Sequence, residues 1–149
     1  MRIIKISFII VGLIIFLMLF GSFLTYRSLN NTSWQFDYMV VNNERQEFLG
    51  SPTLHFNKLS VEGNGGCNGF DGIYMPFIFS RFLFVQGLTT EMACNIVDPQ
   101  TGEEISTLIY EDMFFDAMQK AHRVNVNQER MQIYFGRGDT SVMVFVRVP

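Results

Sequence analysis

Apolar residues fill one uninterrupted run near the start of the chain. No charged side chain occurs from Ile6 to Tyr26, and a helix of that length would span about 31 Å. This length matches the hydrocarbon core of a bilayer, which is about 30 Å thick. A helix buried in a soluble core would normally present one polar face, so the run predicts a transmembrane anchor within residues 1–28.

Charges on either side of this run predict its orientation. Arg2 and Lys5 precede the run and Arg27 follows it, and a basic start favours a cytoplasmic amino terminus with the rest of the chain outside the cytoplasm. A cleaved signal sequence is the alternative, because it has the same basic start and apolar stretch. Against it, Leu19 or Phe20 would occupy the −3 position of the available cleavage sites, where a small residue is needed.

Beyond a polar linker at residues 29–33, short apolar runs alternate with turns that contain glycine or asparagine, which is typical of β-strands. We therefore expect one domain over residues 34–149. A glycine-rich segment, 63–72, interrupts the strands, and 42–45 is expected to be a turn. The expected strands are 34–41, 52–56, 59–62, 73–79, 82–88, 123–127, 130–135 and 141–148.

One helix is expected among the strands, from Glu103 to Ala121, because apolar residues there recur at spacings of three and four. Acidic residues at its start and basic residues at its end suit the helix dipole. The whole pattern predicts an α+β fold that is mainly antiparallel, a small bent sheet or open barrel closed by one helix. The apolar stripe of this helix would consist of Ile105, Leu108, Ile109, Met113, Phe115 and Met118.

Composition narrows the classes of function. The chain carries 14 acidic and 11 basic residues; without Arg2, Lys5 and Arg27 the remainder has 8 basic and 14 acidic residues, a balance of −6. An acidic domain without a basic cluster argues against nucleic-acid binding. Two cysteines are too few for a disulfide-rich miniprotein or a four-cysteine zinc module. The 16 Phe and 9 Met residues provide ample apolar surface, which excludes disorder.

Two motifs resemble a known family. Residues 66–74 have the form G-C-N-x-F-x-G-x-Y, and residues 89–94 have the form T-T-x-M-A-C. In this order they resemble the META domain (HslJ-like) family of bacterial envelope proteins over roughly residues 33–148. The motif residues are Gly66, Cys67, Asn68, Phe70, Gly72, Tyr74, Thr89, Thr90, Met92, Ala93 and Cys94.

The resemblance implies a compact antiparallel β structure with one helix, somewhat like a lipocalin-type or secretion-pilot barrel. It also implies a link to stress and antibiotic tolerance, with no established enzymatic activity. HslJ-like lipoproteins carry a lipidated cysteine after the signal, whereas no cysteine precedes Cys67 here. The apolar run would then replace the lipid as the tether.

The motif residues have structural and chemical interpretations. Glycines permit a tight corner, Asn68 can bond neighbouring amides, and Phe70 and Tyr74 are expected to pack inward; a phosphate cradle would require a pattern that is absent. A disulfide between Cys67 and Cys94 is the natural pairing in an oxidising envelope. Two buried thiols, or a reactive or metal-binding thiol, remain alternatives.

Other chemistry-bearing residues have ordinary structural explanations. His55 is expected to face solvent from a strand, and His122 is expected to act as a helix-end cation. The Arg137-Gly138-Asp139 tripeptide fits an ordinary turn. The helix carboxylates are expected on a solvated face, with a catalytic set as the alternative: Glu111, Asp112 and Asp116.

We therefore expect a non-enzymatic, membrane-tethered, extracytoplasmic protein that serves as an interaction or stress-tolerance module of the bacterial envelope. No catalytic residue, cofactor or metal is expected. The expected partners are the bilayer, through residues 6–26, and an envelope protein. One alternative is a barrel that binds a small apolar ligand in its interior, and another is a hydrolase built on the helix carboxylates.

Overall fold

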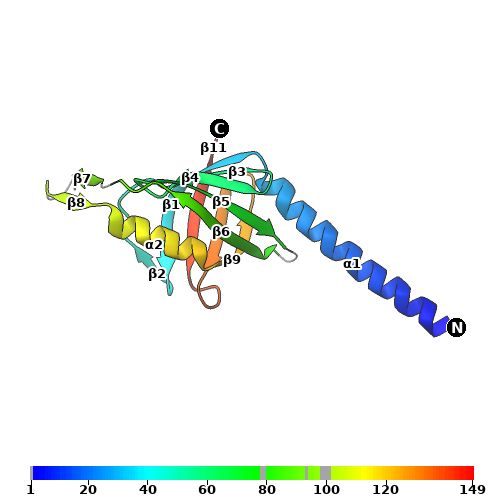
Figure 1. Ribbon diagram of the computed structural model, residues 1–149. Helices are drawn as coiled ribbons and strands as arrows, with labels where there is room; N and C mark the ends of the chain where they lie inside the picture. Colours follow the sequence, from blue (N-terminus) through cyan, green and yellow to red (C-terminus); the bar gives the residue numbers. More distant parts are fainter. Residues whose placement is uncertain (1, 78–79, 93, 98–101) are drawn as a thin grey trace.

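The computed structural model describes residues 2–77, 80–92, 94–97 and 102–149 (Figure 1). Helix α1 (Arg2–Leu29) projects as a rod away from the rest of the chain. Its segment Ile9–Leu29 has the length and hydropathy needed to cross a membrane. Strand β1 begins at Thr32, so two residues separate α1 from the sheet, fewer than the linker expected at 29–33.

The domain is built on one long antiparallel sheet. The strand order is β6-β5-β4-β3-β1-β11-β10-β9, with β2 paired to β1 beside this path, and β7 and β8 forming a separate pair. Its strands are β1 (Thr32–Val41), β2 (Glu44–Gln46), β3 (Thr53–Asn57), β4 (Ser60–Asn64), β5 (Gly69–Pro76), β6 (Phe82–Thr89), β9 (Ala121–Val126), β10 (Arg130–Phe135) and β11 (Val142–Val148). The separate pair is β7 (Asn95–Val97) and β8 (Glu104–Ser106), and helix α2 spans Leu108–Gln119.

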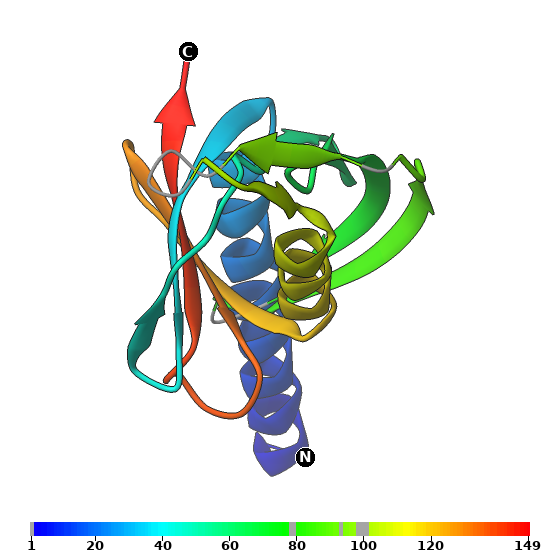
Figure 2. The same ribbon diagram turned by 90° about the vertical axis from the view of Figure 1, so that its left-hand side faces the viewer.

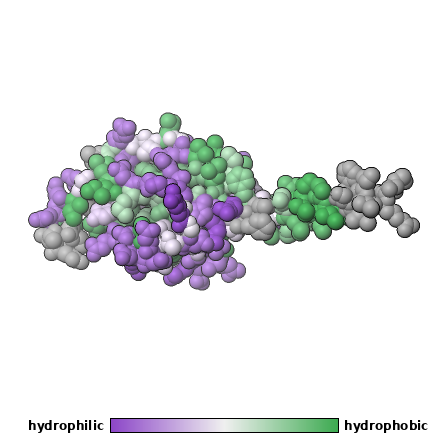
Figure 3. Space-filling model, turned by 90° about the horizontal axis from the view of Figure 1, so that it is seen from below, coloured by the Kyte–Doolittle hydropathy of each residue, from purple (hydrophilic) through white to green (hydrophobic). Residues whose placement is uncertain are grey.

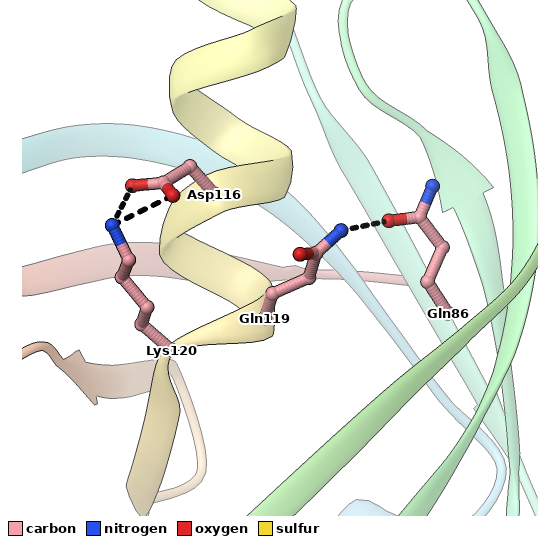
Figure 4. Close-up of polar contacts among 4 residues, drawn as sticks. All are labelled: Gln86, Asp116, Gln119 and Lys120. Carbon is pink, nitrogen blue, oxygen red and sulfur yellow. Dashed lines mark hydrogen bonds and ion pairs between the residues drawn. The ribbon is translucent and has the colours of Figure 1, made fainter.

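The sheet curls until its end strands, β6 and β9, approach each other (Figure 2). An isolated backbone bridge between Arg81 and Arg123 joins the two ends of the sheet. Helix α2 lies along this seam, where the Gln119 Nε2 donates to the Gln86 Oε1 of β6 at 2.9 Å (Figure 4). The result is a nearly closed barrel with one unsealed seam and one covering helix, which confirms the predicted fold class.

Aromatic rings fill the interior of the barrel. The ring centroids of Phe56 and Tyr74 lie 5.0 Å apart, and Phe114 of α2 lies 6.0 Å from Phe70 and 6.5 Å from Phe145. These distances are typical of packed aromatic side chains. Leu29, the last residue of α1, is also fully buried, so the end of α1 belongs to the same core.

The predicted helix was wrong in its length and in part of its buried face, although Met113, Phe115 and Met118 of the expected stripe do pack against the core. It begins at Leu108 rather than Glu103, because residues 104–106 pair as β8 with β7. Leu108 and Ile109 of the expected stripe are 42% and 66% exposed. Phe114 fits between rings of β5 and β11, and this contact sets the rotation of α2. The buried residues of α2 are Glu111, Phe114, Ala117 and Met118.

The turn predicted at 42–45 was too long. Asn42 and Asn43 both adopt positive φ, 52° and 67°, as the two central residues of a tight hairpin turn do. Asparagine tolerates this conformation better than most residues. Glu44 therefore already belongs to β2, where it pairs with Val41 of β1.

Candidate functional site

The glycine-rich motif forms a tight loop between β4 and β5. The Asn64 Nδ2 donates to the carbonyl oxygen of Cys67 at 2.9 Å, while the Asn64 Oδ1 accepts from the backbone N–H of Gly66 at 2.6 Å. Gly66 has a φ of 126°, a conformation that residues with a Cβ rarely adopt. The glycine at this position is therefore required by the backbone of the loop.

A disulfide joins this loop to the second motif. Cys67 and Cys94 are bonded in the structure, with their Cα atoms 5.9 Å apart. Cys94 also holds the start of α2, since its carbonyl oxygen accepts from the Thr107 Oγ1 at 3.0 Å. The backbone N–H of Gly69 in the first motif also donates to the Oγ1 of Thr90 in the second, 21 residues later in the chain. The two motifs therefore meet at one corner of the barrel. Ala93 of the second motif lies outside the described residues.

Asn68 is the residue that connects the elements at this corner. It is 4% exposed, and its Oδ1 accepts from the Met92 backbone N–H at 2.6 Å and the Thr90 Oγ1 at 3.2 Å. Its Nδ2 donates to the Met92 carbonyl oxygen at 3.2 Å and to the Glu111 Oε2 at 2.6 Å. One amide therefore holds the segment after β6 and helix α2 against the glycine loop.

Glu111 completes the corner from helix α2, contrary to its expected place on a solvated face. Its side chain is 3% exposed, and its Oε1 accepts from the Asn68 backbone N–H at 2.6 Å and the Cys67 backbone N–H at 3.4 Å. A Cβ at Gly65 would lie 2.9 Å from the same oxygen. It would also lie 2.8 Å from the Phe115 ring, so the close approach of these two side chains of α2 accounts for the glycine at position 65. We call Cys67, Asn68, Glu111 and Cys94 the disulfide corner.

The remaining motif residues support this corner or the core. Thr89 accepts from the Gln86 Nε2 at 2.6 Å through its Oγ1, and Thr90 accepts from the Gly69 N–H at 3.0 Å. The side chain of Met92 is exposed, so its backbone rather than its thioether takes part in the corner. Phe70 is buried, as expected, and a Cβ at Gly72 would lie 2.6 Å from the Phe84 ring.

Tyr74 lies at the opposite end of β5, close to α1. Its ring is fully buried, as expected, and its hydroxyl donates to the Lys58 carbonyl oxygen at 2.7 Å. Burial, and to a smaller extent the charge of Tyr26 in α1, raises the pKa of Tyr74 to about 12. The neutral, hydrogen-bonded form of Tyr74 is therefore part of the folded domain.

The other candidates from the sequence do not gather at the disulfide corner. Asp116 is exposed and pairs with Lys120 at 2.7 Å (Figure 4), and Asp112 is exposed. His55 is half-buried on β3, where its Nδ1 lies 2.9 Å from the Ser33 Oγ. Neither Asp112 nor Asp116 is therefore a partner of Glu111. The contacts of the disulfide corner hold α2 against the glycine loop.

His122 belongs to β9 rather than to the end of a helix, which corrects the expectation from the sequence. Its Nε2 lies 3.7 Å from the Asp139 Oδ1, and the Arg123 Nη1 lies 2.9 Å from the Asp139 Oδ2. These residues line a surface cleft together with Arg81. The aspartate of the 137–139 turn is thus occupied in an ion pair. Among the described residues, no group of three or more His, Cys, Asp or Glu side chains could hold a metal ion.

The fold and the disulfide corner define a small antiparallel barrel that is covered by one helix and preceded by an apolar helix. The family model of the META domain matches residues 27–148, and the chain belongs to this family. The fold is similar to that of a protein from Burkholderia xenovorans solved by NMR, with a TM-score of 0.64, 20% identity, and coverage of 83% of this chain and 86% of that one. No curated protein sequence matches the chain.

Proposed function

We propose that this protein is a META-domain module tethered to the bacterial cell membrane by α1, with its domain on the extracytoplasmic side, and that it acts by interaction rather than by catalysis. The observation that supports the tether is that the end of α1 packs into the domain. Leu29 ends the helix and is fully buried in the barrel core. The Asn30 Oδ1 then accepts from the Lys58 backbone N–H at 2.7 Å. These contacts fix the end of α1 to the domain, so that a retained anchor would hold the domain close to the membrane. Leu19 or Phe20 at the −3 position of the available cleavage sites supports retention.

The character of the disulfide corner supports a role without catalysis. Both oxygens of Glu111 face N–H donors of the glycine loop, and the sulfur atoms of the two motif cysteines are bonded to each other. The aromatic packing inside the barrel counts against a ligand in its interior. An extracytoplasmic location agrees with the disulfide, because that environment is oxidising. A role in stress or antibiotic tolerance is what the family resemblance suggests.

The tether is tested by the mass and the extraction behaviour of the protein expressed in a bacterial host. A retained anchor predicts the mass of the whole chain and retention in the membrane after alkaline extraction. A reporter enzyme that is active only outside the cytoplasm should be active when fused after Pro149. A shortened chain released into the soluble fraction would contradict the tether, and an inactive exported reporter would contradict the orientation.

The interaction role is tested by deleting the gene and measuring survival under antibiotics that act on the envelope. The full chain should restore survival, and so should a chain in which exposed Asp112 is replaced by Ala. A Glu111→Ala chain, with α2 loosened from the corner, should not. Equal survival with and without the gene under every envelope stress tried would contradict the proposed role.

A further inference from the structure

The outer surface of the β5–β6 hairpin is apolar, unlike the outer surfaces of its neighbours. Strands β3 and β4 present His55, Asn57, Ser60 and Glu62 outward, which is the usual alternation for a sheet with one wet face. On the halves of β5 and β6 nearer to α1 the outward positions are hydrophobic, and each is between 41% and 53% exposed. Together with Leu59 in the adjacent turn, they are here called the apolar hairpin face: Leu59, Ile73, Met75, Phe77, Leu83 and Val85.

This face is one surface rather than scattered residues. The β5–β6 register places Ile73 opposite Val85 and Met75 opposite Leu83, and opposed residues on one face of an antiparallel pair touch. Inward residues of the same hairpin, such as Tyr74 and Phe84, are buried. The hairpin is therefore apolar on both sides, a pattern typical of strands that are covered on both faces. Large exposed apolar patches of this kind mark interaction or membrane surfaces.

The apolar hairpin face continues onto the anchor helix. Phe23 and Tyr26 of α1 line a groove with Met75 and Phe77 of the hairpin. Figure 1 shows the end of β5 beside the helix, and Figure 3 shows green surface on the domain where it approaches α1. The face thus begins where the chain would leave the bilayer.

The position of the groove along α1 sets the depth of the hairpin tip. The uncharged run ends at Tyr26 and Arg27 follows it, so Arg27 would lie at the level of the lipid headgroups. Phe23 lies four residues earlier, which is about 6 Å deeper along the helix axis. Because Phe77 lines the same groove as Phe23, the side chain of Phe77 would lie at a similar depth. Interfacial segments insert their apolar faces to about 5–10 Å.

The hairpin and its neighbouring segment carry basic residues at the end near α1 and acidic residues at the other end, a distribution that favours contact of the basic end with an anionic bilayer. The exposed basic residues Lys58 and Arg81 lie at the tip end, where the Arg81 carbonyl oxygen accepts from the Phe77 N–H at 2.8 Å. At the other end of the strands, exposed Glu62 and Asp71 stand opposite each other on β4 and β5. An anionic lipid surface would attract the tip and repel the far end.

We infer that the apolar hairpin face is a second membrane contact of this protein, with Met75 and Phe77 inserted into the interfacial layer of the bilayer beside α1. This inference rests on the tether proposed above. It gives the domain a fixed side toward the lipid, and it leaves the disulfide corner, at the opposite end of β5, facing away from the bilayer.

The experiment uses the full chain reconstituted in vesicles of phosphatidylcholine and anionic phosphatidylglycerol. An environment-sensitive fluorophore is attached through Leu83→Cys, and in a matched control through Glu62→Cys. The two native cysteines are bonded to each other, which leaves the introduced thiol for labelling. Buried Trp34, the single tryptophan, reports through its emission that both variants fold.

The probe at position 83 should show blue-shifted emission and should be quenched by lipids spin-labelled near the headgroup end of the acyl chain. The probe at position 62 should instead be quenched by aqueous iodide. A probe at position 83 that iodide reaches as easily as the control would overturn the inference. So would a probe that is shielded from iodide without quenching by spin-labelled lipid, because a second copy or another protein would then cover the face.

Retention of the chain after alkaline extraction of the same vesicles separates the two proposals. Loss of retention would overturn the tether and this inference with it. Retention with a water-exposed probe at position 83 would overturn this inference alone and leave the tether standing.

Discussion

Replacing Glu111 by Ala tests whether the disulfide corner holds the helix to the barrel. The change removes two hydrogen bonds of 2.6 Å from Asn68 and a longer one from Cys67. Each bond to a charged acceptor contributes about 1.5–3 kcal/mol, and a buried donor left unpaired costs about 1–3 kcal/mol. Part of this is offset, because the folded state no longer has to bury a charge.

The expected net loss in the free energy of unfolding is about 3 kcal/mol. For a domain of this size such a loss lowers the melting temperature by about 10 °C. Unfolding of the full chain in detergent micelles, with the disulfide intact, is followed by the emission of Trp34, which is fully buried. Asp112→Ala is the matched control, since Asp112 is the exposed neighbour on the same helix and its loss should change stability by no more than about 0.5 kcal/mol.

A third variant, Glu111→Gln, keeps the shape of the side chain but removes its charge and replaces one of its two acceptor oxygens by an NH₂ group. Its amide oxygen can serve the backbone N–H of Asn68, but its NH₂ group then meets the Asn68 Nδ2, another donor. Asn68 cannot rotate to help, because its Oδ1 is already held by Met92 and Thr90. We expect a loss of about 1–2 kcal/mol. Equal stability of Glu111→Ala and Asp112→Ala would refute this account of the corner.

Three further predictions follow from other contacts. Replacing Cys67 and Cys94 together by Ala should lower the free energy of unfolding by about 3–4 kcal/mol, because the disulfide closes a loop with a sequence separation of 27. A reductant should lower the melting temperature of the native chain but not of this variant. Gly63→Ala should prevent stable folding, because its Cβ would lie 1.9 Å from a backbone oxygen, whereas Gly69→Ala, with its closest contact at 3.7 Å, should be tolerated. The pKa of Tyr74 is raised from 10 to about 12 in the folded state. The free energy of unfolding should therefore be unaffected by Tyr74 ionisation below pH 10 and should fall as the pH rises from 10 to about 12. Denaturant titrations should show a smaller alkaline loss for Tyr74→Phe.

The sequence predicts most of the sheet, because strand positions follow from local patterns. Alternating residues place Phe70 and Tyr74 inside, and the structure buries both. The positive φ angles of Asn42 and Asn43 also have a local signal, since two adjacent asparagines suit a two-residue hairpin turn. The predicted turn was too long because polar Glu44 and Arg45 resemble turn residues, although they lie on a strand at the edge of the sheet.

The disulfide corner depends on contacts that no local pattern contains. Glu111 lies 43 residues from Asn68 along the chain, and the helical spacing of apolar residues gives a carboxylate no reason to face inward. The predicted stripe also includes Ile105, which belongs to β8, and this shifts part of the predicted buried face. A signal did exist: an asparagine in a glycine corner needs partners for its amide and for the exposed backbone N–H groups around it. A carboxylate on the following helix can supply both.

The short connection between α1 and β1 links the two membrane contacts proposed here. A tether alone allows a domain to turn freely if its linker is long. Here the connection is held at both of its ends, because Asn30 bonds to the Lys58 N–H and Thr32, the first residue of β1, bonds back to the carbonyl oxygen of Leu29. In a tethered chain, the buried end of α1 would therefore fix which side of the barrel faces the bilayer. The apolar residues of the β5–β6 hairpin lie on that side, where lipid can cover them, and this accounts for a strand pair that is hydrophobic on both faces in a domain with an otherwise acidic balance.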